Sequence, residues 1–326
     1  MIDLPALAYA SSLDAEELCH WQELIAAGSG YTRISIPQKH RRRREVLRPS
    51  VGLDRLLKQL RSGLAFVSRY SAPPEVHGFV RGRDITTNAA RHLDQDVVLR
   101  VDLSDFFGTI DQLKVVKALS DFDFDNDAAR AVAGVALVGG SLAQGFSTSP
   151  FLSNLAFART DAALAELVDG EGVTYTRYVD DMSFSGRVSS VHDDLMDTIT
   201  GLLSAYGWRV NPGKTRFMRR GKPQYVTGLY VGDSAGPHIP RSMKRLLRRE
   251  VYYASKFGLE DARLRSPTPM QHDRLNGWVH YAAHADAAFG ANLRTAWNGV
   301  ESRRYWNNAG RDWDQILDDI HFPDDW

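Results

Sequence analysis

Two adjacent acids, Asp180 and Asp181, stand in a segment whose other residues favour extended structure. β-Branched and aromatic residues are frequent before the pair, in residues 174–179, and Met182, Ser183 and Phe184 follow it. This pattern predicts a tight β-hairpin with the acids at its tip. Like charges are seldom placed side by side in a fold unless a cation neutralises them, and hard carboxylate oxygens suit Mg²⁺. We therefore predict a metal site on this hairpin.

A third acid, Asp102, ends a predicted strand at residues 97–103. Phosphoryl transfer by a two-metal route needs carboxylates from different strands that hold two ions roughly 3.5–4 Å apart. We predict that Asp102 and Asp180 bridge two Mg²⁺ ions and that Asp181 completes the shell, so that all three acids are catalytic. Asp105 is predicted to be a hydrogen-bonding or surface group, and Asp111 to be the N-cap of the following helix.

The elements that must position these acids follow from periodicity and from capping residues. Helices are predicted at residues 14–27, 53–64, 111–119, 128–138, 150–167, 193–206 and in most of the chain after 241. Strands are predicted at 97–103, in the acidic hairpin, at 208–210, 215–218 and 225–231, and in a basic-tipped hairpin at 33–36 and 45–48. This order predicts an α+β fold, a sheet with helices on one face.

Length and composition limit the class of protein to which the chain can belong. The 326 residues suggest two or three domains, and 43% hydrophobic with 25% charged residues is ordinary for a soluble protein. No apolar run approaches the ~18–20 residues that span a bilayer, so no membrane association is expected. Cys19 is the single cysteine, which favours a reducing compartment. We predict a cytoplasmic location.

The net charge of zero hides a marked asymmetry along the chain. Residues 1–32 hold five acids and no Lys or Arg, whereas 33–48 hold seven basic residues against one acid. Residues 214–249 hold ten basic residues against Asp233 alone, and the C-terminal end is acidic again. Two basic blocks around acidic catalytic candidates suit a polyanion that is bound at several places. The alternative is a solvated charged surface.

Several motifs in one order resemble those of reverse transcriptases. The matching segments are DLSDFF at 102–107, QGFSTSP at 144–150, YVDD at 178–181, residues 207–214, VTGLYVG at 226–232 and the basic segment at 36–49. The resemblance implies a right-hand polymerase with fingers, a palm built on an antiparallel sheet, and a mostly helical thumb. It places the N-terminal helix and fingers at 1–95, the palm at 96–232 with a fingers insertion near 111–145, and the thumb with an acidic tail at 233–326.

The same resemblance assigns a dNTP site. Lys39 and Arg44 fall where the family places cations on the nucleotide phosphates, and Lys214 where a residue orients phosphates or protonates pyrophosphate. Phe107 falls beneath the sugar, where a bulky ring excludes a 2′-hydroxyl; the alternative for Phe107 is core packing. Gln144 and Gly145 permit close approach of the backbone to the nucleotide and template.

Two further patterns resemble the bacterial retron reverse transcriptases: Asn88 with His92, and the triplet Val226, Thr227 and Gly228. Taken singly, Asn88 is explained more simply as a helix cap and His92 as a core histidine. The retron resemblance implies a structured noncoding RNA that serves as template and primer. It also implies priming from a 2′-hydroxyl of an internal guanosine, a branched RNA–DNA product (msDNA), an effector protein encoded elsewhere and a part in anti-phage defence.

A basic face is predicted on the helix that starts at Arg241. Five cations recur at helical spacing on one face: Arg241, Lys244, Arg245, Arg248 and Arg249. The opposite face carries the apolar residues Met243, Leu246, Leu247 and Val251. We predict that this helix lies against RNA phosphates. Two other readings stay open: a group II intron-like, diversity-generating or abortive-infection reverse transcriptase, and a non-catalytic RNA-binding scaffold or antitoxin for an effector.

Overall fold

The computed structural model describes residues 1–37, 43–267 and 269–308. These residues form two compact units, one covering 1–227 and the other the chain from 228 onward. The first unit combines helices with a four-stranded sheet, and the second is mostly helical.

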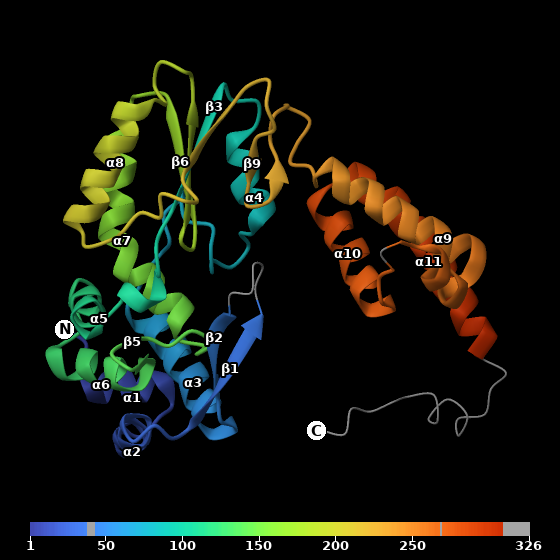
Figure 1. The fold of residues 1–326 in the computed structure, drawn as a ribbon. Coiled ribbons are helices and arrows are strands. Elements are labelled where there is room, and N and C mark those ends of the chain that lie inside the picture. The colour runs from blue at the N-terminus through green and yellow to red at the C-terminus, as the bar shows by residue number, and fades with distance from the viewer. Residues whose placement is uncertain (38–42, 268, 309–326) are drawn as a thin grey trace. The chain divides into compact units, whose positions relative to one another are not determined.

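A four-stranded antiparallel sheet lies in the upper part of the first unit (Figure 1). Its order is β6 (Val173–Tyr178), β7 (Asp181–Gly186), β3 (Val97–Asp102) and β8 (Arg216–Arg219). The long helices α7 (Ser149–Val168) and α8 (Asp193–Ala205) cover one face, and the short α4 (Ile85–Ala89) lies on the other side. The predicted α+β sheet with its major helices on one face is confirmed.

Helices and a hairpin form the rest of the first unit. They are α1 (Leu4–Ser11), α2 (Ala15–Ala26), β1 (Tyr31–Pro37), β2 (Arg43–Pro49), α3 (Val51–Val67), α5 (Gln112–Ser120) and α6 (Asn126–Ala136). The five leucines of α3 that share one face are fully buried, because that face packs into the core. Asp111 accepts a hydrogen bond from the Lys114 backbone N–H, which confirms it as the N-cap of α5.

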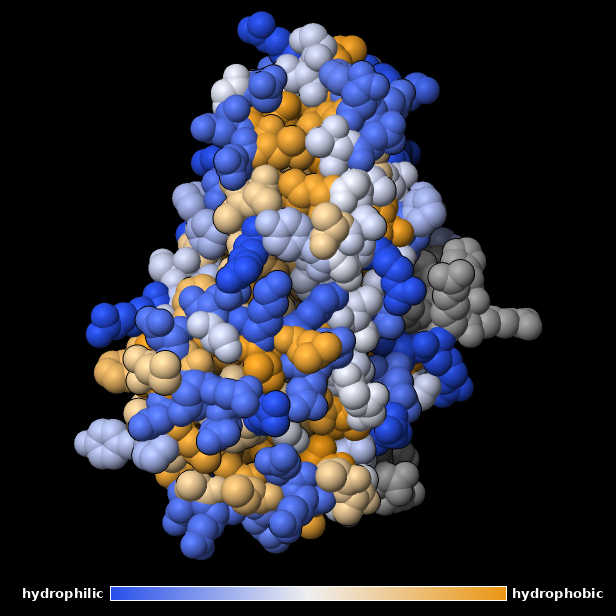
Figure 2. All heavy atoms as spheres, turned by 90° about the vertical axis from the view of Figure 1, so that its left-hand side faces the viewer, coloured by the Kyte–Doolittle hydropathy of each residue, from blue (hydrophilic) through white to orange (hydrophobic). Residues whose placement is uncertain are grey.

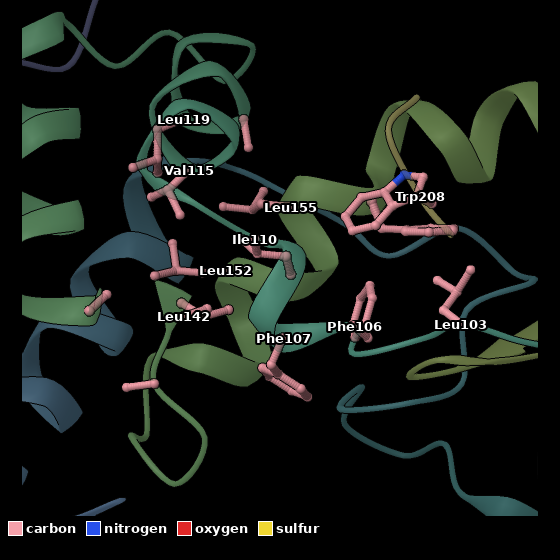
Figure 3. Packing of buried hydrophobic residues seen from close by; sticks show 14 of the residues in the cluster. Leu103, Phe106, Phe107, Ile110, Val115, Leu119, Leu142, Leu152, Leu155 and Trp208 are labelled. Atoms are coloured by element: carbon pink, nitrogen blue, oxygen red, sulfur yellow. The ribbon is translucent and has the colours of Figure 1, made fainter. Parts of the chain in front are cut away.

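One hydrophobic core includes Leu103, Phe106 and Phe107, which follow β3 in the chain (Figure 3). Phe106 packs against Phe157 and Trp208, with ring centroids 5.9 and 5.4 Å away. The first unit also contains two single-turn 3₁₀ helices, at Ala90–His92 and Phe107–Thr109. It has two further short strands, β4 (Leu137–Val138) and β5 (Ser141–Leu142). The core therefore reaches the residues that directly follow Asp102.

Two strand predictions were wrong. Residues 208–210 form no strand; Val210 makes only an isolated bridge to Leu103. The predicted strand 225–231 is interrupted, giving β9 (Tyr225–Val226) and β10 (Leu229–Tyr230). Thr227 and Gly228 between them have φ of 46° and 83°, a left-handed backbone that ends a strand.

The second unit contains α9 (Arg241–Arg265), α10 (His272–Ala285) and α11 (Ala287–Asn308). Gly258, with φ 80° and ψ 167°, interrupts α9. Trp297 is 1% exposed and its indole N–H donates to Asn276 Oδ1 at 2.9 Å, so this ring is a core residue.

No helix within the described residues is long and apolar enough to cross a lipid bilayer. Figure 2 shows hydrophilic residues spread over the face it presents, with apolar residues between them.

Candidate active site

The acidic hairpin forms as predicted. Strand β6 ends at Tyr178 and β7 begins at Asp181, which leaves Val179 and Asp180 as a two-residue turn. The register places Asp102 of β3 directly opposite Asp181 of β7. Val179 has φ 63°, and left-handed backbone costs an L-residue about 1–2 kcal/mol. The surroundings must therefore hold this turn in place.

A buried network supplies that support. Arg177 is fully buried and forms an ion pair with Asp161 of α7, with Nη2 and Oδ2 2.6 Å apart. Its Nη1 donates to the Val179 carbonyl at 3.0 Å, so the guanidinium connects α7 directly to the turn. Gly78 packs on the other side, where an added Cβ would lie 2.5 Å from the Val179 nitrogen. Arg177 was not predicted, since nothing local distinguishes it from a surface arginine in a strand.

Two cations neutralise acids of the site. Lys214 Nζ lies 2.9 Å from Asp102 Oδ1, and Arg100 Nη2 lies 2.7 Å from Asp181 Oδ2. The Arg100 group is also 3.9 Å from Asp102. Arg100 was not predicted, although its position two residues before Asp102 on one strand places both side chains on the same face.

The site carries more negative charge than its surroundings favour. Burial, and next the charge of Asp102, raise the pKa of Asp180. Burial also raises the pKa of Asp181, although Arg100 opposes this effect. A divalent cation would relieve both effects, and carboxylate oxygens are ligands that suit Mg²⁺. Among the described residues, no group of three or more His, Cys, Asp or Glu side chains is close enough together to hold a metal ion. Asp102 and Asp181 are turned to Lys214 and Arg100 instead.

A cleft of about 990 Å³ opens beside the acids. It brings together most of the residues predicted for the nucleotide site: Arg44, Phe107, Gln144, Gly145 and Lys214. Lys39 lies outside the described residues.

Strand β2 and the Gln144–Gly145 segment are joined at the cleft. Arg44 Nε donates to Gln144 Oε1 at 2.8 Å, and the Leu47 N–H donates to the Gln144 carbonyl at 2.7 Å. Gly145 has φ 112°, and a Cβ there would overlap the Leu47 carbonyl oxygen. The glycine is therefore required for β2 to approach this closely.

The two neighbouring phenylalanines have different surroundings (Figure 3). Phe106 points toward Trp208, whereas the Phe107 ring points the other way. Phe107 is 9% exposed and Phe106 3%, and both contribute to the wall of the cleft. Phe107 is thus a largely buried ring at the cleft surface. Phe79 also lines the cleft and was missed by sequence analysis.

The residues singled out as markers lie outside the cleft, apart from Thr227. His92 is buried between Ser185 and Thr176, and each of its ring nitrogens lies 2.7 Å from a hydroxyl oxygen. Burial, with His77 and then Arg91 adding to it, lowers the pKa of His92 to about 3, so the ring is neutral. Asn88 is inside α4 and does not cap it; Asp84 does.

The triplet at 226–228 contacts the same region. Val226 is 1% exposed, and Thr227 Oγ1 donates to the Ile85 carbonyl at 3.0 Å. Gly228 follows with its left-handed backbone. The hydrogen bond joins the triplet to the first residue of α4, the helix that contains Asn88.

The five cations of α9 are not equivalent. Lys244 Nζ lies 2.6 Å from Asp286 and Arg249 Nη2 lies 3.0 Å from Glu250, and both acids are buried. Arg241, Arg245 and Arg248 are exposed. The helical spacing was right, but Lys244 and Arg249 have partners within the second unit that the spacing could not show.

Asp102 ends β3, Asp181 begins β7 opposite it and Asp180 lies in the turn before β7, beside a cleft that Arg44, Arg100 and Lys214 also line. A family model described as reverse transcriptase (RNA-dependent DNA polymerase) matches residues 38–245, which is more than half of the chain. The chain belongs to the reverse transcriptase family, as the motifs predicted.

Individual relatives narrow the likeness to retron enzymes. The chain is 30% identical over 286 residues to the Retron Mx162 reverse transcriptase of Myxococcus xanthus, covering 77% of this chain and 58% of the relative. It is 32% identical over 277 residues to the Retron Mx65 reverse transcriptase of the same organism, covering 75% and 63%. The Retron Ec86 reverse transcriptase of Escherichia coli is 24% identical over 82% of this chain and 79% of its own length. The chain thus spans about 58–63% of the length of the two Myxococcus relatives.

Solved structures give two further matches. One is a foamy viral protease-reverse transcriptase in complex with double-stranded DNA, with a TM-score of 0.42 and 16% identity, covering 78% of this chain and 36% of that one. The other is telomerase from Candida albicans in complex with a fragment of telomeric RNA, with a TM-score of 0.45 and 12% identity, covering 86% and 59%.

Proposed function

We propose that this chain is a bacterial, cytoplasmic retron reverse transcriptase. It copies its own structured noncoding RNA into msDNA, priming from the 2′-hydroxyl of an internal guanosine and consuming dNTPs. The observation that carries this proposal is the presence of Asp102, Asp180 and Asp181 beside one cleft in a chain similar to retron enzymes. An effector protein encoded elsewhere and a role in anti-phage defence belong to the same proposal.

Asp102 and Asp180 would hold two Mg²⁺ ions, with Asp181 completing the set. When bound, the ions supply Lewis-acid stabilisation of the charge that develops on the phosphates and the attacking hydroxyl. Lys214 and Arg100 neutralise Asp102 and Asp181, and would be available for substrate phosphates if those acids held metal ions. Arg suits such contacts because its guanidinium binds phosphate in a bidentate manner.

The other residues of the cleft position the nucleotide. Arg44, held by Gln144, presents a cation to the triphosphate. Gly145 lets the backbone approach the nucleotide and template. Phe107 lies under the sugar and selects dNTPs over rNTPs. In this scheme residues 1–95 are the N-terminal helix and fingers, 96–232 the palm with its insertion near 111–145, and 233–326 the thumb and tail.

Total nucleic acid from bacteria that express the gene with its flanking DNA tests this function. We expect a small branched RNA–DNA species that vanishes in Asp180→Ala. Active extension of generic primers without any branched species would instead indicate a different lineage of reverse transcriptase. Tight RNA binding with no polymerase activity in the wild type would indicate a scaffold.

The exposed cations of α9 lead to a second prediction, which concerns RNA binding. Replacing Arg241, Arg245 and Arg248 together with Ala should weaken RNA binding and lower the slope of log K against log salt by about two to three, because roughly one counterion is released per phosphate contact. Binding measured between low and moderate salt gives the slope.

A charge-matched control separates this effect from a general loss of positive charge. Arg61, Lys117 and Arg130 are exposed cations of the first unit. Their triple Ala variant should keep the wild-type salt slope. Equal slopes for both triple variants and the wild type would reject the assignment of α9 to RNA.

A further inference from the structure

Phe79 is an unusual residue of the cleft. It is 49% exposed, whereas the other phenylalanines that line the cleft, Phe106, Phe107 and Phe146, are buried. Its φ of 61° lies in the left-handed region, which a bulky L-residue seldom adopts. Such strain persists only where the surrounding structure fixes the residue, and it concentrates at functional sites.

The segment that carries Phe79 is fixed to the catalytic hairpin. The backbone N–H of Arg177 donates to the Glu75 carbonyl, and the backbone N–H of His77 donates to the Arg177 carbonyl, each at 2.8 Å. Asn154 Nδ2 donates to the Gly78 carbonyl at 3.0 Å. Gly78 itself packs against the backbone of Val179. Phe79 is therefore anchored to the turn that carries Asp180.

The Phe79 ring meets Phe107 edge to face. Their centroids are 6.5 Å apart and their planes are inclined by 67°. Phe106 contacts Phe107 as well, with centroids 5.5 Å apart. Figure 3 shows that the Phe107 ring points away from Trp208, and 9% of Phe107 remains exposed. Phe79 supplies the aromatic contact that comes from outside the core.

A ring can exclude a 2′-hydroxyl only if it cannot move aside. A clash with a mobile side chain is relieved at little cost, whereas a clash in a packed environment must displace several neighbours. We propose that Phe79 is a specificity-determining positioning residue. It holds the Phe107 ring in place and thereby sets the preference for deoxyribonucleotides. This inference rests on the proposed role of Phe107.

Steady-state incorporation of one dNTP and of the matching rNTP tests the proposal on a primed template. The measured quantity is the ratio of kcat/KM for rNTP to that for dNTP. Phe79→Ala should raise this ratio by about tenfold, and Phe107→Ala should raise it further. Phe79→Tyr keeps the ring and should restore the wild-type ratio. The double Ala variant should equal Phe107→Ala alone, because Phe79 acts through Phe107.

The outcomes are distinct. A Phe79→Ala ratio within twofold of wild type overturns the proposal, as does an effect that multiplies that of Phe107→Ala. Slower use of both nucleotides at an unchanged ratio would assign Phe79 to the template or to folding, and overturns it too. A wild-type protein that extends no primer rejects the proposed function itself, and this inference with it.

Discussion

Asp180→Asn should lower the rate of primer extension by at least about a thousandfold. The substitution removes one ligand charge from the predicted metal site, and metal-borne charge stabilisation is worth several kcal/mol, with tenfold in rate for each ~1.4 kcal/mol. Single-nucleotide extension at saturating dNTP and Mg²⁺ measures the loss.

Asp105→Asn is the matched control for this variant. Asp105 is an exposed acid of the same cleft, but it lies beyond the end of β3. Its φ is 48°, and Asn accepts left-handed backbone readily. We expect near wild-type extension from Asp105→Asn. Equal losses in both variants would mean that the cleft needs acidity in general, and not a ligand at 180.

The melting temperature of Asp180→Asn should equal or exceed that of the wild type. Burial and the charge of Asp102 raise the pKa of Asp180, so the ionised carboxylate is less favourable in the folded chain than in water. Its contribution to stability is most favourable below the ordinary pKa of 3.8 and is lost as pH rises from there through the raised pKa. A melting temperature several degrees lower would attribute the lost activity to unfolding.

Asp161→Asn should reduce the free energy of unfolding by about 3–5 kcal/mol. Asp161 is 1% exposed, and it accepts from Arg177 through both oxygens and from the Tyr175 hydroxyl. Asn has nearly the same shape as Asp but leaves the Arg177 cation buried without a counter-charge. Removing one partner of a buried ion pair in this way costs about 3–5 kcal/mol. Urea denaturation of the wild type and the variant gives the difference.

Two comparisons sharpen this expectation. Glu17→Gln, which breaks the exposed Glu17–Arg55 pair, should leave the denaturation midpoint nearly unchanged. Replacing both buried partners, as Asp161→Leu with Arg177→Met, should recover much of the stability because no charge is left unpaired. If Asp161→Asn unfolds at the wild-type urea concentration, the buried pair does not support the fold as described.

What the sequence predicted well was local. The acidic hairpin and the N-cap at Asp111 follow from neighbouring residues, and the buried face of α3 follows from spacing alone. The sequence did not predict the parts played by Phe79, Arg100 and Arg177. Each of them contacts a residue that is not its neighbour in the chain; for example, Arg177 pairs with Asp161 and Arg100 with Asp181.

Two other patterns show what local sequence leaves undetermined. The apolar residues at 225–231 read as one strand, but the left-handed backbone at Thr227 and Gly228 divides it. The five cations of α9 share the predicted spacing, but the buried Asp286 pairs with one of them. Local pattern predicts which face a side chain lies on; it does not predict what lies across from that face.

The pairing of Lys214 with Asp102 and of Arg100 with Asp181 has a consequence for how the site is loaded. If metal ions bound Asp102 and Asp181, the site would exchange its own counter-ions for the metal and not simply gain cations. The displaced lysine and arginine would then be available to incoming phosphates, and the local charge would stay close to balanced. On the proposed function, binding of metal and binding of nucleotide would therefore be coupled.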